Sequence, residues 1–240
     1  PFDVSPYAHA AFQFFLRNPI CQEMARKFKM SFSSSDEDTA LSYIHDLGFI
    51  AKLKDGKRGF KVMLGGGLGS QPRHADELYD FLPAEEIIPL IEGVLRVFDR
   101  HGERAKRLKA RMKFLLKDIG KEAFMELVAE QKTALSQEQP EFEIERFEAA
   151  PALQEVEVPS VEMEDEIEFE NWKQTNVFAQ KQEGLFAIGI RVPLGDFYTR
   201  GARQLAYLIK KYAGNELRLT LRQDILIRHV RKDLLPFFYT

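Results

Sequence analysis

The sequence predicts an α+β protein with a mixed sheet and helices over residues 1–132, an acidic linker over 133–175, and a smaller strand–helix–strand module over 176–240. Three observations support this prediction. Two apolar runs flank Asp55-Gly56, which is a strong hairpin signal. Long stretches with apolar residues at helical spacing follow that hairpin, and the charge pattern then changes abruptly before the last module.

Composition limits the possible classes of protein. The chain has 240 residues, of which 45% are hydrophobic, so it is long and apolar enough to bury a core. It has no apolar run of about 18 residues and no signal-like start, so we expect no membrane partner and a cytoplasmic location. Its single cysteine, Cys21, excludes an internal disulfide and any site made of several thiolates from this chain alone.

Charge is distributed unevenly along the chain. Residues 138–170 hold thirteen Asp/Glu and one Arg, a net charge of −12, whereas the whole chain carries −3. The rest of the chain is therefore basic, at about +9 by subtraction. An anionic ligand fits this balance better than a nucleic-acid surface, in which basic residues would be interleaved with exposed aromatics along one face. Scattered, solvated charge is the alternative.

The stretch from Ala25 to Ser33 alternates with a period of two and predicts a strand. One face carries apolar side chains and the other carries ammonium and hydroxyl groups: Phe28, Met30 and Phe32 against Lys27, Lys29 and Ser31. Like charges at Lys27 and Lys29 repel unless an anion lies over them, so a small oxyanion or a polycarboxylate cofactor would suit them. Two solvated lysines on a half-exposed strand are the simpler alternative.

A run of glycines follows the hairpin. Four of the five residues in Gly65-Gly66-Gly67-Leu68-Gly69 are glycine, which indicates either unusual backbone angles or a close approach of the backbone to a large group. The run fits neither a dinucleotide fingerprint nor a Walker loop. Free backbone amides that face a flat or anionic ligand are the functional interpretation, and a plain turn is the alternative.

Three helices are predicted beyond the glycines, of which the last, over 121–131, closes the first module. Pro83 to Arg100 has a broad apolar stripe typical of a core helix. A second, strongly basic helix is expected next, in which Arg104, Arg107 and Arg111 share one face through i, i+3, i+7 spacing. Guanidinium groups bind carboxylates with two parallel hydrogen bonds, so this face would suit a cofactor rich in carboxylates; solvated surface charge is the alternative.

The last module reads as strand, helix, strand. A strand is predicted over 184–192, a helix over 200–213 with Thr199 as its N-cap, and a long alternating strand over 217–230. This order is half of a ferredoxin-like unit. The apolar end, 234–240, has nothing after it to pack on, and the chain has no initiator Met, so we expect a fragment of a longer protein.

Several motifs, taken in their order and spacing, resemble the nitrite and sulfite reductases that contain sirohaem: RKFKMSF, HDLGFIAKL, GFKVMLGGGLG and HGERAKRLKARMKFLLKDIG. The resemblance extends to LTLRQDILI in the last module, which is similar to the second ferredoxin-like half-domain of these enzymes. It implies a mixed α+β sirohaem domain, first repeat, over 1–132 and a truncated half-domain over 176–240.

The resemblance implies a reaction, cofactors and site residues. The reaction is the six-electron reduction of sulfite to sulfide or of nitrite to ammonia, at a sirohaem coupled to a 4Fe-4S cluster, with a ferredoxin or a flavoprotein as electron donor. Lys27 and Lys29 match the lysines that hold the anion and donate protons. The residues that match cofactor-binding positions are Gly65, Gly66, Gly67, Arg104, Arg107 and Arg111.

Two departures from the family pattern matter. The cysteines that hold the family's cluster come from a C-terminal segment that this sequence does not contain, so the cluster ligands are expected outside this chain and no metal ligand is assigned within it. Arg222 and Gln223 match only the second, pseudo-repeated half, which leaves their role open. We therefore expect the 240-residue chain alone to be inactive. A non-catalytic module that binds an anion or a tetrapyrrole through the same basic face is the alternative function.

Overall fold

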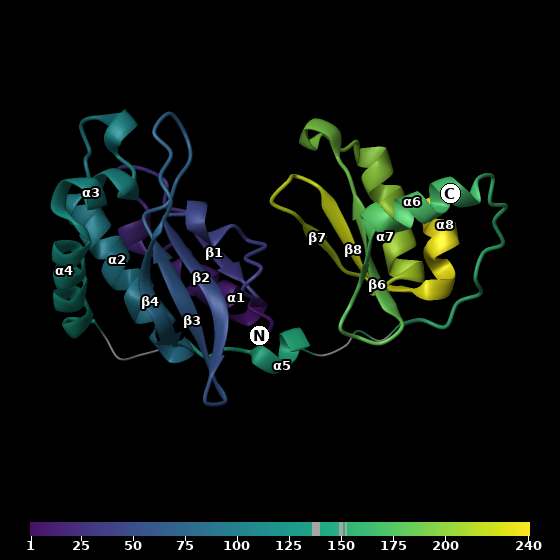
Figure 1. Ribbon diagram of the computed structural model, residues 1–240, viewed down its shortest axis with the longest axis horizontal. Helices are drawn as coiled ribbons and strands as arrows, with labels where there is room; N and C mark the ends of the chain where they lie inside the picture. Colours follow the sequence, from purple (N-terminus) through teal and green to yellow (C-terminus); the bar gives the residue numbers. More distant parts are fainter. Residues whose placement is uncertain (136–139, 149–150, 152) are drawn as a thin grey trace. The chain divides into compact units, whose positions relative to one another are not determined.

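The computed structural model describes residues 1–135, 140–148, 151 and 153–240 (Figure 1). The chain divides into two compact units, Pro1–Glu148 and Ala149–Thr240, here called unit 1 and unit 2. Residues 133–175, expected as a linker, belong partly to each unit.

Unit 1 contains a four-stranded mixed sheet with the strand order β1-β2-β3-β4. Its strands are β1 (Met30–Ser33), β2 (Leu47–Lys54), β3 (Lys57–Leu64) and β4 (Asp76–Pro83). β1 is parallel to β2, and the other pairs are antiparallel. The predicted hairpin is confirmed: Asp55 and Gly56 both have positive φ, 51° and 74°, as a tight hairpin turn requires. The sequence did not predict β4.

The helices of unit 1 are α1 (Ser5–Phe15), α2 (Ile87–His101), α3 (Met112–Ile119), α4 (Lys121–Thr133) and α5 (Ile144–Glu148). Figure 1 shows α2, α3 and α4 grouped beside the sheet. The apolar stripe of α2 packs into a core shared with the sheet, in which Phe60 and Ile91 are fully buried. Phe60 lies edge-on to the rings of Phe2, Phe32 and Phe49.

The predicted basic helix from Arg104 is wrong over its first half. Arg107–Lys109 form one 3₁₀ turn, and α3 begins only at Met112. The carboxylate of Glu103 accepts hydrogen bonds from the backbone N–H groups of Ala105, at 2.6 Å, and Lys106, at 3.0 Å. These bonds close a local turn over residues 103–106, and repulsion between cations one helical turn apart, such as Arg107 and Arg111, opposes a helix that starts at Arg104. The three arginines therefore do not share one helix face.

The predicted strand from Ala25 is shorter than expected, since β1 begins at Met30. The alternation nevertheless persists before the strand. Phe28 packs against the ring of Phe98, with centroids 5.7 Å apart, while Lys27 and Lys29 are exposed. The polar face changes further along, because Ser31 and Ser33 are buried. The two lysines thus lie outside the strand, on its N-terminal extension.

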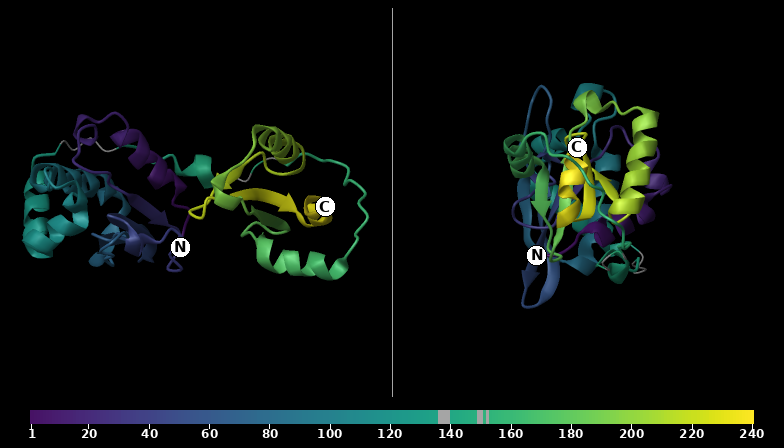
Figure 2. Two further views of the ribbon diagram at one scale, coloured as in Figure 1. Left: turned by 90° about the horizontal axis from the view of Figure 1, so that it is seen from above. Right: turned by 90° about the vertical axis from the view of Figure 1, so that its right-hand side faces the viewer.

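Unit 2 contains an antiparallel sheet with the order β5-β6-β8-β7. Its elements are α6 (Glu166–Asn176), β5 (Val177–Ala179), β6 (Leu185–Ile190), α7 (Thr199–Tyr212), β7 (Leu217–Leu219), β8 (Ile225–Arg231) and α8 (Leu235–Tyr239). Residues of α6 and α7 pack into one core with β6 and β8, and Figure 2 shows unit 2, coloured green to yellow, from two further sides. The long strand predicted over 217–230 is instead the β7–β8 hairpin, which turns through Gln223 with a φ of 67°.

Three further expectations for unit 2 need correction. The acidic segment contains α6, whose N-cap Asp165 accepts hydrogen bonds from two backbone N–H groups and whose Trp172 packs into the unit's core. Thr199 is the first residue of α7, and the N-cap position belongs to Tyr198. The apolar C-terminal segment is packed rather than free, because Leu235 in α8 is buried in the same core.

Candidate anion and cofactor site

Unit 1 has a strongly cationic surface pocket of about 580 Å³. Its six lining residues are Met24, Ala25, Arg26, Lys27, Arg104 and Arg107. Four of these six are cations and none is acidic, so the pocket favours anions, although Arg104 is also paired with Asp99. The structure thus brings together three of the residues predicted from the sequence, namely Lys27, Arg104 and Arg107.

Arg104 ties this pocket to the end of α2. Its guanidinium donates to the carbonyl oxygen of Glu23, at 3.0 Å, and to that of Asp99, at 3.1 Å. It also forms an ion pair with the Asp99 carboxylate. Because several of its donors are used in this way, Arg104 orders the segment that leads to Lys27, whereas Arg107 is exposed on the neighbouring 3₁₀ turn. The two arginines therefore contribute differently to the pocket.

Arg26 lines the pocket although the sequence analysis did not select it. Its Nε is buried and has no hydrogen-bond partner within the described part of the chain. A buried donor without a partner costs free energy, and an anionic ligand would supply the missing acceptor. The available signal was its position directly before Lys27 in the RKFK motif.

Asp46 joins the remaining predicted residues next to β2. Its Oδ2 accepts hydrogen bonds from the backbone N–H of Lys29, at 2.8 Å, and from Nη2 of Arg111, at 2.7 Å. Its backbone carbonyl accepts from the N–H of Gly65, also at 2.8 Å. The Asp46 side chain is 0% exposed. Burial raises the pKa of this carboxyl group, and the opposing attraction of Arg111 only partly offsets that effect.

The glycine run does not present free amides, contrary to the sequence expectation. Gly65, Gly66 and Gly67 are all buried, and their N–H groups donate to the carbonyl oxygens of Asp46, His45 and Arg73, respectively. Close packing explains two of these glycines. A Cβ on Gly66 would lie 2.5 Å from the Tyr43 carbonyl oxygen, and Gly65 has a φ of 82°. Contact between this loop and a cofactor stays a prediction, and it would have to use surface other than the amides.

Lys113 fixes the tip of the same loop. This buried side chain donates from Nζ to the carbonyl oxygens of Leu68, at 3.0 Å, and Gln71, at 2.6 Å. Burial and the nearby Arg111 lower the pKa of its ammonium group. In the sequence, Lys113 is only one of several residues in a basic stretch. Its role depends on contacts with a distant loop, which the local sequence does not reveal.

The predicted residues therefore form two clusters connected through the short segment Lys27–Lys29. One cluster is the cationic pocket, and the other is the Asp46 junction with Arg111 and the glycine loop. Arg111 does not line the pocket, and the exposed ammonium group of Lys29 belongs to neither cluster by direct contact. The segment Lys27–Lys29 is anchored between them by the Phe28 ring and by the backbone N–H of Lys29.

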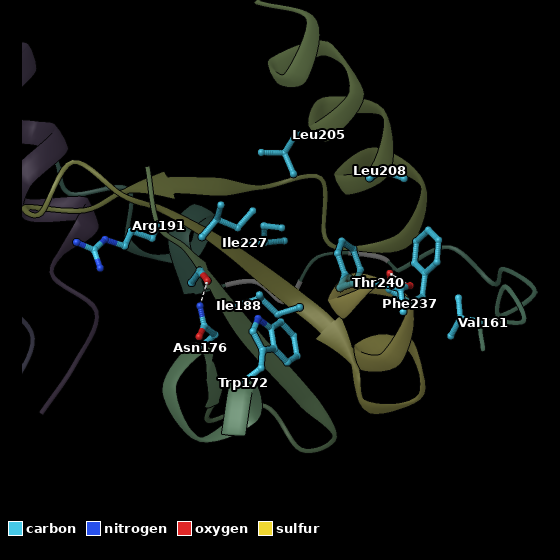
Figure 3. A pocket seen from close by; sticks show the side chains of 13 residues that line it. Val161, Trp172, Asn176, Ile188, Arg191, Leu205, Leu208, Ile227, Phe237 and Thr240 are labelled. Atoms are coloured by element: carbon cyan, nitrogen blue, oxygen red, sulfur yellow. Dashed lines mark hydrogen bonds between the residues drawn. The ribbon is translucent and has the colours of Figure 1, made fainter. Parts of the chain in front are cut away.

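Unit 2 has a pocket of different chemistry (Figure 3). Its volume is about 570 Å³, and most of its lining is apolar, including Trp172, Leu205 and Ile227. The side chain of Asn176 donates to the Gly189 carbonyl oxygen at 2.8 Å, shown as a dashed line in Figure 3. Arg222 and Gln223 do not line this pocket but are exposed in the β7–β8 turn.

The described residues contain few side chains suited to bind a metal ion. Among the described residues, no group of three or more His, Cys, Asp or Glu side chains is arranged to hold a metal ion. The lone Cys21 is partly buried, and burial together with Glu92 and Asp99 raises its pKa, which disfavours the thiolate. Likewise, none of the helices in the described ranges is long and apolar enough to span a membrane.

Comparison with known families gives two matches. Residues 1–135 match the family described as "Nitrite and sulphite reductase 4Fe-4S domain", and residues 178–238 match the "Nitrite/Sulfite reductase ferredoxin-like half domain". The fold resembles that in the structure of the Mycobacterium tuberculosis NirA protein, with a TM-score of 0.72 and 23% identity. That similarity covers 95% of this chain and 38% of NirA.

Curated relatives include the chloroplastic ferredoxin–nitrite reductase of Oryza sativa subsp. japonica, which is 30% identical over 96% of this chain and 35% of its own length. The ferredoxin–nitrite reductase of Synechococcus elongatus is also 30% identical, over 89% of this chain and 38% of its own. An assimilatory ferredoxin-dependent nitrite reductase of Haloferax mediterranei is 30% identical over 86% of this chain and 34% of its own length. The chain thus spans between a third and two fifths of the length of these relatives.

Proposed function

Because the chain belongs to the nitrite and sulfite reductase family, we propose that it forms part of a sirohaem-dependent reductase of nitrite or sulfite. Its proposed share of the work is to bind the substrate anion, to hold carboxylates of the cofactor and to deliver protons. The single observation that carries this proposal is the cationic pocket in which Lys27 lies beside Arg26, Arg104 and Arg107.

The two cofactors of the proposed enzyme fit this chain differently. Sirohaem carries several carboxylates, and the guanidinium groups of Arg26, Arg107 and Arg111 are suitable partners for them. The buried Nε atoms of Arg26 and Arg111, which have no partner among the described residues, support this fit. When bound, sirohaem would pass electrons from the external donor to the substrate. The 4Fe-4S cluster does not fit this chain, which has one cysteine, so its ligands must come from elsewhere.

The lysines would bind the anion and donate protons to it. Reduction of nitrite or sulfite releases oxygen as water, so each departing oxygen must receive protons as electrons are added. Exposed ammonium groups at Lys27 and Lys29 can hold the negative charge and donate those protons, which serves both electrostatic and acid catalysis. Their anchoring by the Phe28 ring and the Asp46 carboxylate would keep both groups in place during the reaction.

The names of the relatives support nitrite as the substrate and ferredoxin as the electron donor. Both are proposals for this chain, with sulfite and a flavoprotein as the other candidates that the sequence left open. The cytoplasmic location expected from the sequence also stays a proposal.

The experiment is a turnover assay on the full-length protein that contains this chain. With reduced viologen as the electron donor, the protein that contains sirohaem should reduce nitrite, sulfite or both, and competing assays would identify the preferred anion. The 240-residue chain alone should reduce neither. Turnover by the short chain would contradict the inference that the cluster ligands lie outside it, and no turnover by the loaded full-length protein would contradict the proposed function.

A further inference from the structure

Asp46 is the one buried carboxylate among the described residues. It contacts three segments that are distant in sequence, namely the extension before β1, the loop after β3 and the start of α3. Each contact reaches a residue of the proposed site: the backbone of Lys29, the backbone of Gly65 and the guanidinium of Arg111. None of these contacts uses a group that the substrate would need, because the Lys29 ammonium group is not involved.

The arrangement at Asp46 is unfavourable for stability alone. Its Oδ1 is buried without a hydrogen-bond partner in the described part of the chain, and the same is true of Nε of Arg111. Each buried polar atom without a partner lowers the free energy of unfolding by about 1–3 kcal/mol. Buried ion pairs often contribute no more to stability than apolar residues of similar volume would. Stability alone therefore does not explain the charged pair at this place.

We propose that Asp46 is a positioning residue of the anion site. Its carboxylate fixes the Arg111 guanidinium and the Lys29 backbone relative to each other, and a bound anion or cofactor carboxylate requires this arrangement. One carboxylate oxygen accepts from both groups, so any shift of Arg111 is coupled to the lysine segment. The free Nε of Arg111 is then left for a ligand acceptor. This inference rests on the proposed function and adds a residue that touches neither substrate nor the reacting atoms.

The test compares variants of the full-length, sirohaem-loaded protein. Asp46→Asn keeps the side-chain size but removes the charge that holds Arg111. Arg111→Lys keeps the charge but loses the rigid guanidinium geometry, and it serves if Asp46→Asn does not fold. Ser42→Ala is the matched control, because Ser42 is equally buried near β1 but hydrogen-bonds to Ser31 and Ser33 instead. The measurements are sirohaem content, melting temperature, and the dissociation constant of nitrite from absorbance titration.

We expect Asp46→Asn and Arg111→Lys each to weaken nitrite binding or sirohaem retention about tenfold, and Ser42→Ala to change both less than twofold. The double variant Asp46→Asn/Arg111→Lys should bind no more weakly than Arg111→Lys alone, because both changes remove the same arrangement. Asp46→Asn should lower the melting temperature more than Ser42→Ala, because it leaves the Arg111 guanidinium without its counter-charge. Arg111→Lys keeps the ion pair, so its melting temperature should stay close to that of Ser42→Ala while binding is lost, which a purely structural role of the pair would not give.

Two results would overturn the positioning role: nitrite and sirohaem binding within twofold of the unaltered protein in Arg111→Lys or Asp46→Asn, or additive effects in the double variant. These differ from a failure of the proposed function. If the unaltered full-length protein binds neither sirohaem nor nitrite, the proposed function is wrong; if it binds both and the variants match it, only the role of Asp46 is wrong.

Discussion

The two units each have a surface pocket of almost the same volume, about 580 Å³ in unit 1 and 570 Å³ in unit 2, but of opposite chemistry. Four of six residues lining the first are cations, whereas Arg191 is the one cation among the thirteen that line the second. Volume therefore does not distinguish the two pockets, whereas charge favours the pocket of unit 1 as the proposed anion site. This difference in charge predicts that binding of the substrate and of the cofactor carboxylates depends on unit 1. The experiments that follow treat the two units separately or probe the pocket of unit 1.

The largest expected effect comes from the double substitution Lys27→Met/Lys29→Met in the full-length protein. We expect the rate of nitrite or sulfite reduction to fall about 100-fold or more, because both proposed proton donors and their positive charge are lost. Sirohaem content, measured by absorbance, should be retained. Turnover is measured with reduced viologen.

A matched control for this experiment is Lys54→Met/Lys57→Met, which removes two exposed lysines from the ends of β2 and β3 at their turn. It should leave turnover within about twofold, since the charge change is the same but lies outside the pocket. Equal losses in both double variants would mean that net charge, rather than the cationic pocket, governs activity.

The next effect is on the free energy of unfolding of the 240-residue chain, and it tests the cores of the two units separately. Phe60→Ala should destabilise unit 1 by about 3–5 kcal/mol, because a fully buried ring is replaced by a cavity. Ile227→Ala should destabilise unit 2 by about 2–5 kcal/mol for the same reason. Trp172, the chain's single tryptophan, lies in unit 2, so its fluorescence during urea unfolding reports on that unit alone.

We therefore expect Ile227→Ala, and not Phe60→Ala, to shift the Trp172 transition. Circular dichroism, which detects both units, should shift in both variants. A Trp172 transition that moves equally in the two variants would show that the units unfold together.

A smaller effect is expected within the glycine loop. Gly66→Ala should destabilise unit 1 by about 1–3 kcal/mol, because its Cβ would lie 2.5 Å from a backbone oxygen that cannot move freely. Gly67→Ala is the control, since its Cβ would lie 3.4 Å from the Lys113 side chain, an ordinary contact. Urea unfolding gives the comparison, and sirohaem content shows whether Gly67 itself faces the cofactor. If Gly67→Ala unfolds more easily than Gly66→Ala, the packing explanation of this loop is wrong.

The smallest effect is a pH dependence of unit 2. His229 is buried with a φ of 59°, and burial together with Arg228 lowers its pKa, although Glu216 opposes this. The unfolded chain then binds the proton more readily than the folded one, so stability should fall as pH drops below about 6.5. His229→Asn, which tolerates positive φ, should flatten this dependence in urea titrations that follow Trp172 between pH 5 and pH 8. An unchanged pH dependence in His229→Asn would assign it to other groups.

Local sequence patterns predicted the parts of the fold that depend on neighbouring residues. The Asp55-Gly56 hairpin and the core helix α2 follow directly from turn chemistry and apolar spacing. The helix expected from Arg104 failed because the segment is crowded with cations that repel one another at helical spacing, and only one 3₁₀ turn forms before Met112. Helix α6 was missed because its acidic composition concealed the apolar residues that face its core.

The candidate site was partly predictable for the same reason. The KxK segment and the arginines were selected by residue type, and the structure places Lys27 with Arg104 and Arg107. Asp46 was not selected, since its contacts with Lys29 and Arg111 span 17 and 65 residues of sequence. The glycines were interpreted as ligand-facing because their contacts with the backbone of Tyr43 and His45 are likewise non-local.

The most direct measurement is a crystal structure of the full-length protein with its cofactor and bound nitrite or sulfite. The anion should lie within hydrogen-bond distance of the Lys27 ammonium group, with the cofactor carboxylates against the arginines of the cationic pocket and Arg111. An anion bound away from Lys27 and Lys29, with Arg26, Arg107 and Arg111 all turned to solvent, would contradict the assignment of the site to unit 1.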